Sequence, residues 1–215
     1  MTYLEIVNKV LIRLREDQVS TVEQTPYSAL VGEFVNDAKQ LVEDAWDWSA
    51  LRTTLTVTTS ANTFNYNLTG TGNRVTILDV VNDTSNNFMT YKDAHWFNNT
   101  FLNSDPAVGS PFYYTFNGID ANGDTAVDVY PIPNGVYALR FNSILRTGQL
   151  EEDTDAVNIP TLPIIHIAFA MALRERGETG GQSAAEAYIY ADRVMSDAIA
   201  LDASKHPEET IYAVV

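Results

Sequence analysis

The sequence has no cysteine among its 215 residues and only three histidines. The absence of cysteine excludes disulfide bridges and thiolate chemistry. The three histidines are scattered and never paired at the spacing of metal ligands, so any bound metal would have to be held by oxygen atoms. The remaining residues also contain little that resembles a catalytic motif, as described below, and we predict no catalytic residue, no metal site and no cofactor.

Long apolar runs are also missing. A membrane helix needs about 20 consecutive apolar residues, and no stretch of the sequence reaches that length. The N-terminal stretch MTYLEIVNKVLIRLRED has charges among its apolar residues and lacks the basic leader and cleavage site of a secretory signal. With 45% hydrophobic residues, the chain can bury a sizeable core. We expect a soluble globular protein that is made in the cytoplasm and has no membrane partner.

Basic residues are scarce: 13 Lys and Arg stand against 28 Asp and Glu, a formal net charge of -15. The excess of acid lies at the two ends of the chain, while residues 50–150 are nearly neutral. Affinity for nucleic acid comes largely from Lys and Arg that replace counterions on the phosphates. The composition therefore disfavours specific or tight DNA binding.

The hydrophobic period changes twice along the chain. Apolar residues at helical spacing predict two amphipathic helices within residues 1–49. From Leu51 the period falls to two, which predicts strands. A helical pattern returns after residue 160, where the run from Ile164 to Leu173 is apolar nearly all round and predicts a helix enclosed by protein. A fourth helix is predicted after it.

Seven stretches of the middle region have the alternation and the threonine, valine and aromatic content of strands. They are residues 51–58, 64–68, 74–81, 88–91, 112–117, 125–130 and 136–145. A short helix is predicted from Ala94 to Leu102. Strands at this spacing predict a small antiparallel sandwich or barrel-like domain.

We infer an α+β protein in which a terminal helical bundle is interrupted by the β domain. Each helical pair has an apolar stripe that it cannot bury alone, so the two pairs are expected to pack together. The predicted parts are a bundle of residues 1–49 and 160–206, a β domain of residues 50–150, an acidic linker of residues 151–159 and a tail of residues 207–215. Phe34 and Phe169 are assigned to the bundle core, where truncation to alanine costs about 3–5 kcal/mol.

Four features resemble functional sites, but local structure explains each of them better. Gly70 to Gly72 lacks the lysine and third glycine of a phosphate loop and is predicted to be a hairpin turn. Asp120 to Asp124 has calcium-like oxygen spacing without the glutamate of a calcium loop, so a tight hairpin turn is predicted. The acidic run from Glu151 to Asp155 is predicted to be solvated. His166 is predicted to be a core histidine.

Aromatic residues gather in two places and suggest sugar-binding surfaces, since flat rings stack on sugars. One place holds Trp46 and Trp48, and the other holds His95, Trp96, Phe97 and Phe101. Helical and helix-end spacing favours a core position for all of them. Trp46 and Trp48 are expected at the junction of helix and sheet.

In the order of its parts, nearly the whole chain resembles the head-to-tail adaptor proteins of short-tailed phages, the tail tubular protein A family. The resemblance rests on WDWSALRTTLTVTT after the second helix, on GSPFYYTFNG and VDVYPIPNGVYALRFN in the strand region, and on NIPTLP before the helical finish. It implies a dodecameric ring that binds the portal protein and the tail nozzle protein and lets double-stranded DNA pass without specific binding. It also implies a non-enzymatic virion protein, assembled in the host cytoplasm.

The tail PEETIYAVV ends in four apolar side chains: Ile211, Tyr212, Val214 and Val215. Burying them gains about 1.5–3 kcal/mol each at most, while ordering the tail costs about 1–2 kcal/mol per residue. Because the two terms nearly cancel, ordering the tail on its own subunit gains little free energy. We therefore expect the tail to become ordered when it binds a neighbouring subunit or the portal. The alternative is an arm folded back on its own subunit.

Other functions compete with the adaptor interpretation. A carbohydrate-binding module would use the Trp96 region as a stacking face, and a glycoside hydrolase would need two carboxylates across a cleft. A tail-tube or baseplate protein of a longer-tailed phage is a nearer alternative. A ring would favour the adaptor, and a monomer that retains oligosaccharide would favour the module.

Overall fold

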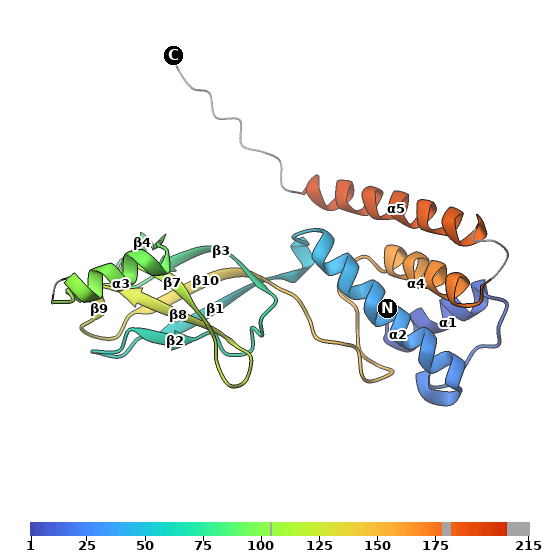
Figure 1. Cartoon of the computed structure of the whole chain (residues 1–215), viewed down its shortest axis with the longest axis horizontal. Coiled ribbons are helices and arrows are strands. Elements are labelled where there is room, and N and C mark those ends of the chain that lie inside the picture. The colour runs from blue at the N-terminus through green and yellow to red at the C-terminus, as the bar shows by residue number, and fades with distance from the viewer. Residues whose placement is uncertain (104, 178–181, 206–215) are drawn as a thin grey trace, which may run out of the picture. The chain divides into compact units, whose positions relative to one another are not determined.

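The computed structural model of the chain describes residues 1–103, 105–177 and 182–205 (Figure 1). It shows a mixed α+β protein that divides into two compact units. Residues 1–50 and the described residues from 147 to 205 form the helical unit, and the described residues of 51–146 form the β unit. The helices of the helical unit are α1 (Tyr3–Arg13), α2 (Pro26–Ala45), α4 (Thr161–Glu175) and α5 (Gln182–Ala203), with 3-10 turns at Val22–Gln24 and Ser49–Leu51.

The first two helices begin at capping boxes. At α1 the Thr2 hydroxyl accepts a hydrogen bond from the Glu5 backbone N–H, and the Glu5 carboxylate accepts one from the Thr2 N–H. At α2 the side chains and N–H groups of Thr25 and Ser28 pair in the same way, and Pro26 lies in the first turn. Caps satisfy N–H groups that no helical carbonyl reaches, so these residues fix where the helices begin.

Helix α4 has neighbours on several sides: it packs against α1, α2 and α5 (Figure 1). Ile164, Ala168 and Ala172 of α4 are fully buried. A helix in such a position needs apolar side chains nearly all round its surface, which is the pattern of its sequence.

The buried face of α2 differs from the expected one. Phe34 is only half-buried, whereas Lys39 and Glu43 on the same helix are buried. The side chains of these two residues form hydrogen bonds with residues 147–148, and this contact covers the side of α2 on which they lie. Phe169 of α4 is half-buried as well. The assignment of Phe34 and Phe169 to the core is therefore wrong, and the cost expected for truncating them does not apply.

The β unit contains ten short strands and one helix among its described residues. They are β1 (Arg52–Thr58), β2 (Asn65–Asn67), β3 (Val75–Asn82), β4 (Asn87–Phe88), β5 (Thr90–Tyr91), α3 (Ala94–Asn103), β6 (Val108–Gly109), β7 (Tyr113–Ile119), β8 (Thr125–Tyr130), β9 (Ile132–Pro133) and β10 (Ala138–Leu145). One sheet has the order β1-β10-β3-β4, a second has the order β2-β8-β7-β5, and β6 pairs with β9.

Most strand pairs are antiparallel, but β5–β7 and β6–β9 are parallel. The prediction of an antiparallel domain is confirmed for the other pairs and is wrong at these two. Parallel neighbours need a crossover connection, usually a helix. Helix α3 lies in the connection between β5 and β7, which explains why a helix interrupts the strand region.

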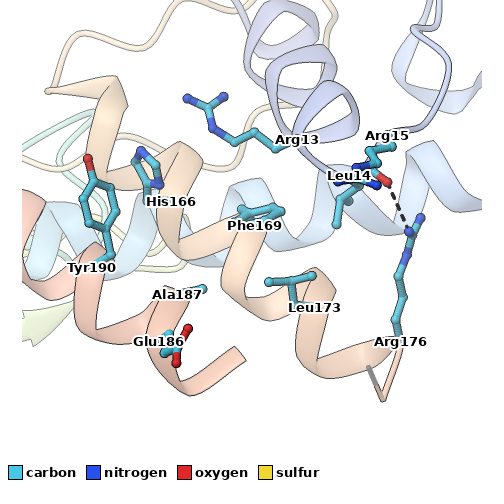
Figure 2. A pocket seen from close by; sticks show the side chains of 10 residues that line it. All are labelled: Arg13, Leu14, Arg15, His166, Phe169, Leu173, Arg176, Glu186, Ala187 and Tyr190. Atoms are coloured by element: carbon cyan, nitrogen blue, oxygen red, sulfur yellow. Dashed lines mark hydrogen bonds between the residues drawn. The ribbon is translucent and has the colours of Figure 1, made fainter. Parts of the chain in front are cut away.

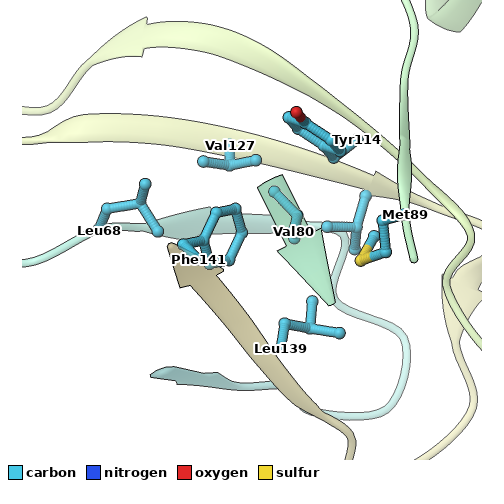
Figure 3. Close-up of a cluster of buried hydrophobic side chains, with 8 residues drawn as sticks. Leu68, Val80, Met89, Tyr114, Val127, Leu139 and Phe141 are labelled. Carbon is cyan, nitrogen blue, oxygen red and sulfur yellow. The ribbon is translucent and has the colours of Figure 1, made fainter. Parts of the chain in front are cut away.

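Both four-stranded sheets contribute to one hydrophobic core (Figure 3). Val80 on β3 and Phe141 on β10 come from the first sheet, and Tyr114 on β7 and Val127 on β8 come from the second. Side chains alternate between the two faces of a strand, so burial of one face produces the period of two in the sequence.

The two glycine-containing turns differ. Asp120 to Asp124 joins β7 to β8, an antiparallel pair that aligns Ile119 with Thr125, so the hairpin prediction is confirmed. Gly70 to Gly72 connects β2, which pairs with β8, to β3, which pairs with β10. Because its flanking strands belong to different sheets, the hairpin prediction for Gly70 to Gly72 is wrong.

Candidate functional site

The two tryptophans after α2 are held by hydrogen bonds within the helical unit. Trp48 is only 1% exposed, and its indole Nε1 donates to the Val42 carbonyl at 2.6 Å. Trp46 is half-buried, and its Nε1 donates to the Asp202 carboxylate of α5 at 3.2 Å. Both indoles thus hold the chain that follows α2 in place, and burial closes the Trp48 ring to a ligand.

Asp202 is the acceptor at the centre of this arrangement. Its carboxylate also accepts hydrogen bonds from the Ser49 backbone N–H at 2.9 Å and the Ser49 hydroxyl at 2.5 Å, and it pairs with the Lys205 ammonium at 2.9 Å. Burial opposes ionisation of Asp202, but the hydrogen bonds from Ser49 and Lys205 outweigh burial and hold its pKa well below the usual range. A carboxylate with this many donors is a structural anchor and not a general base.

The turn from Gly70 to Gly72 binds a carboxylate group of the protein itself. The Gly72 backbone N–H donates to the Asp124 carboxylate at 3.0 Å. Hydrogen bonds from the Gly72 and Gly70 backbone lower the pKa of Asp124. Because a carboxylate of the same chain occupies this nest of N–H groups, the turn is not a phosphate site.

The calcium-like loop is likewise satisfied from within. The Asp120 carboxylate accepts hydrogen bonds from the Asn122 and Asp124 backbone N–H groups at 2.8 and 2.9 Å. Among the residues that the structure describes, no three His, Asp or Glu side chains are grouped to hold a metal ion. The oxygen spacing therefore reflects a turn stabilised by its own aspartate.

The acidic run is not a solvated linker throughout. The Asp153 carboxylate accepts a hydrogen bond from the Val22 N–H at 2.9 Å, and the Asp155 carboxylate accepts from the Glu151 and Glu152 N–H groups at 2.8 and 2.9 Å. The last two bonds lower the pKa of Asp155. The prediction of a solvated run is wrong for Asp153 and Asp155, because both satisfy backbone donors of the helical unit.

The aromatic residues of α3 pack on one another. Trp96 is half-buried, with ring centroids 5.0 Å from Tyr113 and 5.7 Å from Tyr130, and the Lys92 ammonium lies 5.6 Å from its ring. Phe97 is buried. These tilted and edge-to-face contacts use the ring surfaces that a sugar would need.

Two further predictions concern His95 and the C-terminal tail. His95 is exposed, so its assignment to the core is wrong. It lies on α3 on the side away from the buried Phe97. Ile211, Tyr212, Val214 and Val215 of the tail lie outside the described residues.

The helical unit also contains a surface groove that the sequence did not predict. It has a volume of about 650 Å³ and lies where α1, α4 and α5 meet (Figure 2). Its lining residues are Arg13, Leu14, Arg15, His166, Phe169, Leu173, Arg176, Glu186, Ala187 and Tyr190. We call this feature the arginine groove.

The floor of the arginine groove is apolar and its rim is cationic. Phe169 and Leu173 of α4 form part of the floor, while Arg13 and Arg15 come from the end of α1 (Figure 2). In the part of the chain that the structure describes, neither Arg13 nor Arg15 forms an ion pair with a carboxylate. Three of the 13 basic residues of an acidic chain line this one groove, so it is a local exception to the overall charge.

His166 belongs to the arginine groove and not to the core. Its ring is half-buried and lies 4.8 Å from the Tyr190 ring at an interplanar angle of 70°. Burial, and then the positive charge of Arg13, lower the pKa of His166, so the ring is neutral at neutral pH. The core prediction for His166 is wrong, because the apolar period of α4 does not show that this side faces a groove.

The third arginine of the groove is fixed in place. The Arg176 guanidinium donates to the Tyr27 hydroxyl and to the Glu16 carboxylate, each at 2.6 Å. Its pKa is raised because these two bonds outweigh its desolvation. The sequence contained one signal for this groove that was missed. Arginines lie at the ends of both α1 and α4 in an otherwise acidic chain.

The candidate ligand-binding turns of the described residues are thus occupied by side chains of the chain itself, and the arginine groove is the new feature that the structure adds. No helix of the described residues is long and apolar enough to cross a membrane. A comparison with proteins of curated function finds no match. The sequence matches the family described as SU10 adaptor protein over residues 1–209, which agrees with the resemblance to phage head-to-tail adaptors. Because the match covers nearly the whole sequence, the chain belongs to the SU10 adaptor protein family.

Proposed function

We propose that the protein is the head-to-tail adaptor of a phage virion, a ring that joins the portal protein to the tail nozzle protein. The family match over residues 1–209 carries this proposal. The expected ring is a dodecamer in the virion neck, assembled in the host cytoplasm. The protein is a structural component and performs no catalysis.

The division into two units suits a ring component. We propose that the four helices act as a bundle that forms the wall, and that the two sheets act as a sandwich that contacts the next ring. The β unit exposes large apolar side chains, among them Phe88 at 74%, Leu102 and Val136. We propose that these side chains contribute to the surface that contacts the next ring, since apolar side chains gathered into one patch are typical of protein interfaces.

The net charge of -15 supports a role as a DNA conduit. Acidic walls repel phosphates and so prevent the passing genome from sticking, although salt limits this repulsion to about 8 Å at physiological ionic strength. We expect acidic residues of the helices to face the lumen. In a filter-retention assay, the recombinant protein should not hold labelled duplex DNA with submicromolar affinity near physiological salt.

Native mass spectrometry and negative-stain microscopy test the proposal. The protein is mixed with the portal protein of the same phage, and rings attached to the portal are the expected result. A protein that stays monomeric with portal and retains oligosaccharides on a column would refute the adaptor role and support a carbohydrate-binding module. Rings that stack into long tubes without portal would support a tail-tube protein.

A further inference from the structure

We propose that the arginine groove of the helical unit binds the segment PEETIYAVV, residues 207–215, of a second copy of the chain. The inference deepens the proposed ring function, on which it rests in part, by assigning a contact between neighbouring subunits. Residues 207–215 lie outside the described residues, so the proposal uses only their sequence.

The groove favours a ligand with both negative charge and apolar side chains, although Glu186 adds one carboxylate to its lining and the Arg13 guanidinium also donates to the Lys9 carbonyl at 2.9 Å. Its floor of Phe169 and Leu173 favours apolar groups, and Arg13 and Arg15 at its rim have no carboxylate partner among the described residues. Tyr190 is 52% exposed at one end. A volume of about 650 Å³ falls within the range of about 300–1,000 Å³ that is usual for ligand pockets, which is room for a few side chains of a peptide.

The segment from residue 207 has the complementary chemistry. Glu208 and Glu209 come first, and Ile211, Tyr212 and Val214 follow. No basic residue lies between residues 207 and 215. The glutamates can pair with the guanidinium groups of Arg13 and Arg15, and the apolar side chains can cover the floor.

The reach of the chain favours a second copy over the same copy. Glu186 of the groove precedes Lys205 by 19 residues, which is about 28 Å along an α-helix. Glu209 follows Lys205 by four residues, and four extended residues span at most about 14 Å. The glutamates therefore fall short of the Glu186 end of their own groove, whereas a neighbouring copy has no such restriction.

A contact of this kind is head-to-tail, because a segment of one copy enters a groove of the next. Repeated contacts of this type close into a ring when the rotation between copies allows it. The same weak contact is then made once per subunit, which increases its effect on assembly.

The test uses a fluorescent peptide of residues 206–215 and the full-length protein, with binding followed by fluorescence anisotropy. Reversing the rim with Arg13→Glu and Arg15→Glu should weaken peptide binding at least about tenfold, because two attractive charges become repulsive. Peptides with Ile211→Asp or Tyr212→Asp should also bind about tenfold more weakly, because the apolar floor then faces a charge. The matched control is Arg52→Glu, which makes the same charge change at an exposed residue of β1; it should leave binding within about twofold.

Exchanging the charges of both partners shows whether a loss of binding comes only from misfolding of the Arg13→Glu, Arg15→Glu variant. A peptide with Glu208→Lys and Glu209→Lys should bind the unaltered protein weakly and regain affinity for the Arg13→Glu, Arg15→Glu variant. Equal binding of both peptides to both proteins, or no binding of the natural peptide at millimolar concentration, would overturn the inference.

The outcome is separable from that of the proposed function. If the protein forms rings on its portal but does not bind the peptide, the groove assignment fails and the adaptor role stands. If the peptide binds in the predicted manner but no ring forms with portal, the contact stands and the adaptor role fails.

Discussion

Lys39 and Glu43 are charged residues on the buried face of α2. Their ammonium and carboxylate groups lie 2.9 Å apart, with side chains 4% and 1% exposed. Lys39 also donates to the Gly148 carbonyl at 2.7 Å, and Glu43 accepts from the Thr147 hydroxyl at 2.7 Å. The pair thus holds α2 to the chain where it re-enters the helical unit, at a separation of more than 100 residues.

Replacing one member of this pair should cost more than replacing both. Lys39→Met leaves the Glu43 carboxylate buried without its ammonium, and we expect a loss of about 3–5 kcal/mol in unfolding free energy. The double variant Lys39→Met, Glu43→Met should be more stable than Lys39→Met alone. Urea unfolding of the two variants measures the difference, with Gln40→Met on the exposed side of α2 as the control. A double variant less stable than either single one would contradict this account.

Asp202 should make the stability of the helical unit depend on acid. Its folded-state pKa lies below the unfolded value of about 3.9, so the ionised carboxylate stabilises the fold above that pH, and the contribution is lost as the pH falls toward the folded pKa. We expect Asp202→Asn to reduce the unfolding free energy by about 1.5–3 kcal/mol at neutral pH, because its hydrogen bonds lose a charged acceptor. The reduction should shrink as the pH falls below the unfolded pKa.

Urea unfolding at neutral and at acidic pH measures this dependence. Asp192→Asn, at an exposed position of the same helix, is the control and should change little at either pH. If Asp202→Asn costs the same at both pH values, the ionisation of Asp202 is not the source of its contribution.

At the scale of the elements, α1 and α2 approach closely at Gly32. A Cβ atom on Gly32 would lie 2.5 Å from the Tyr3 hydroxyl oxygen and 2.7 Å from a Val22 methyl group. Alanine favours a helix over glycine by about 1 kcal/mol, but here the overpacking should prevail.

We therefore expect Gly32→Ala to lower the unfolding free energy by about 1–3 kcal/mol. Thermal unfolding followed by circular dichroism measures it. Adding Tyr3→Phe removes the closest atom and should restore part of the loss. The control is Gln40→Ala on the exposed side of α2, and a Gly32→Ala protein that melts higher than the natural one would disprove the close contact.

The sequence predicts elements well where their signal is local. The stretch from Thr125 to Tyr130 was predicted as a strand and is β8, and the helix predicted from Ala94 is α3. The period of two begins at Leu51, which is the first residue of the β unit. Alternation and helical spacing arise from the faces of single elements, so they are visible in one stretch of sequence.

Features that depend on distant partners were not predicted. Burial of Lys39 follows from its bonds to a segment more than 100 residues away, which no local period reports. The arginine groove combines the ends of α1 and α4 with one side of α5, so its residues are together only in the folded unit. His166 was misassigned for the same reason.

At the scale of the molecule, the β unit has the topology of an insertion. Its first strand, β1, pairs with its last strand, β10, and the register places Arg52 opposite Ile144. Their Cα atoms are therefore about 5 Å apart. On the side of the helical unit, Ser49 is held by Asp202 and Thr147 is held by Glu43. The chain thus enters and leaves the β unit at neighbouring points, each anchored by the helical unit's own residues.

We expect each unit to fold without the other. A protein of residues 51–146 contains the two sheets and their shared core, and it should unfold cooperatively with a strand-type circular dichroism spectrum. The complementary protein replaces residues 51–146 with a Gly-Ser linker of about four residues, which is long enough to span the gap between the paired strand ends. It should give a helical spectrum and keep the loss caused by Lys39→Met, because that pair lies entirely within the helical unit. A disordered β unit, or a helical unit in which Lys39→Met no longer matters, would show that the two units depend on each other for folding.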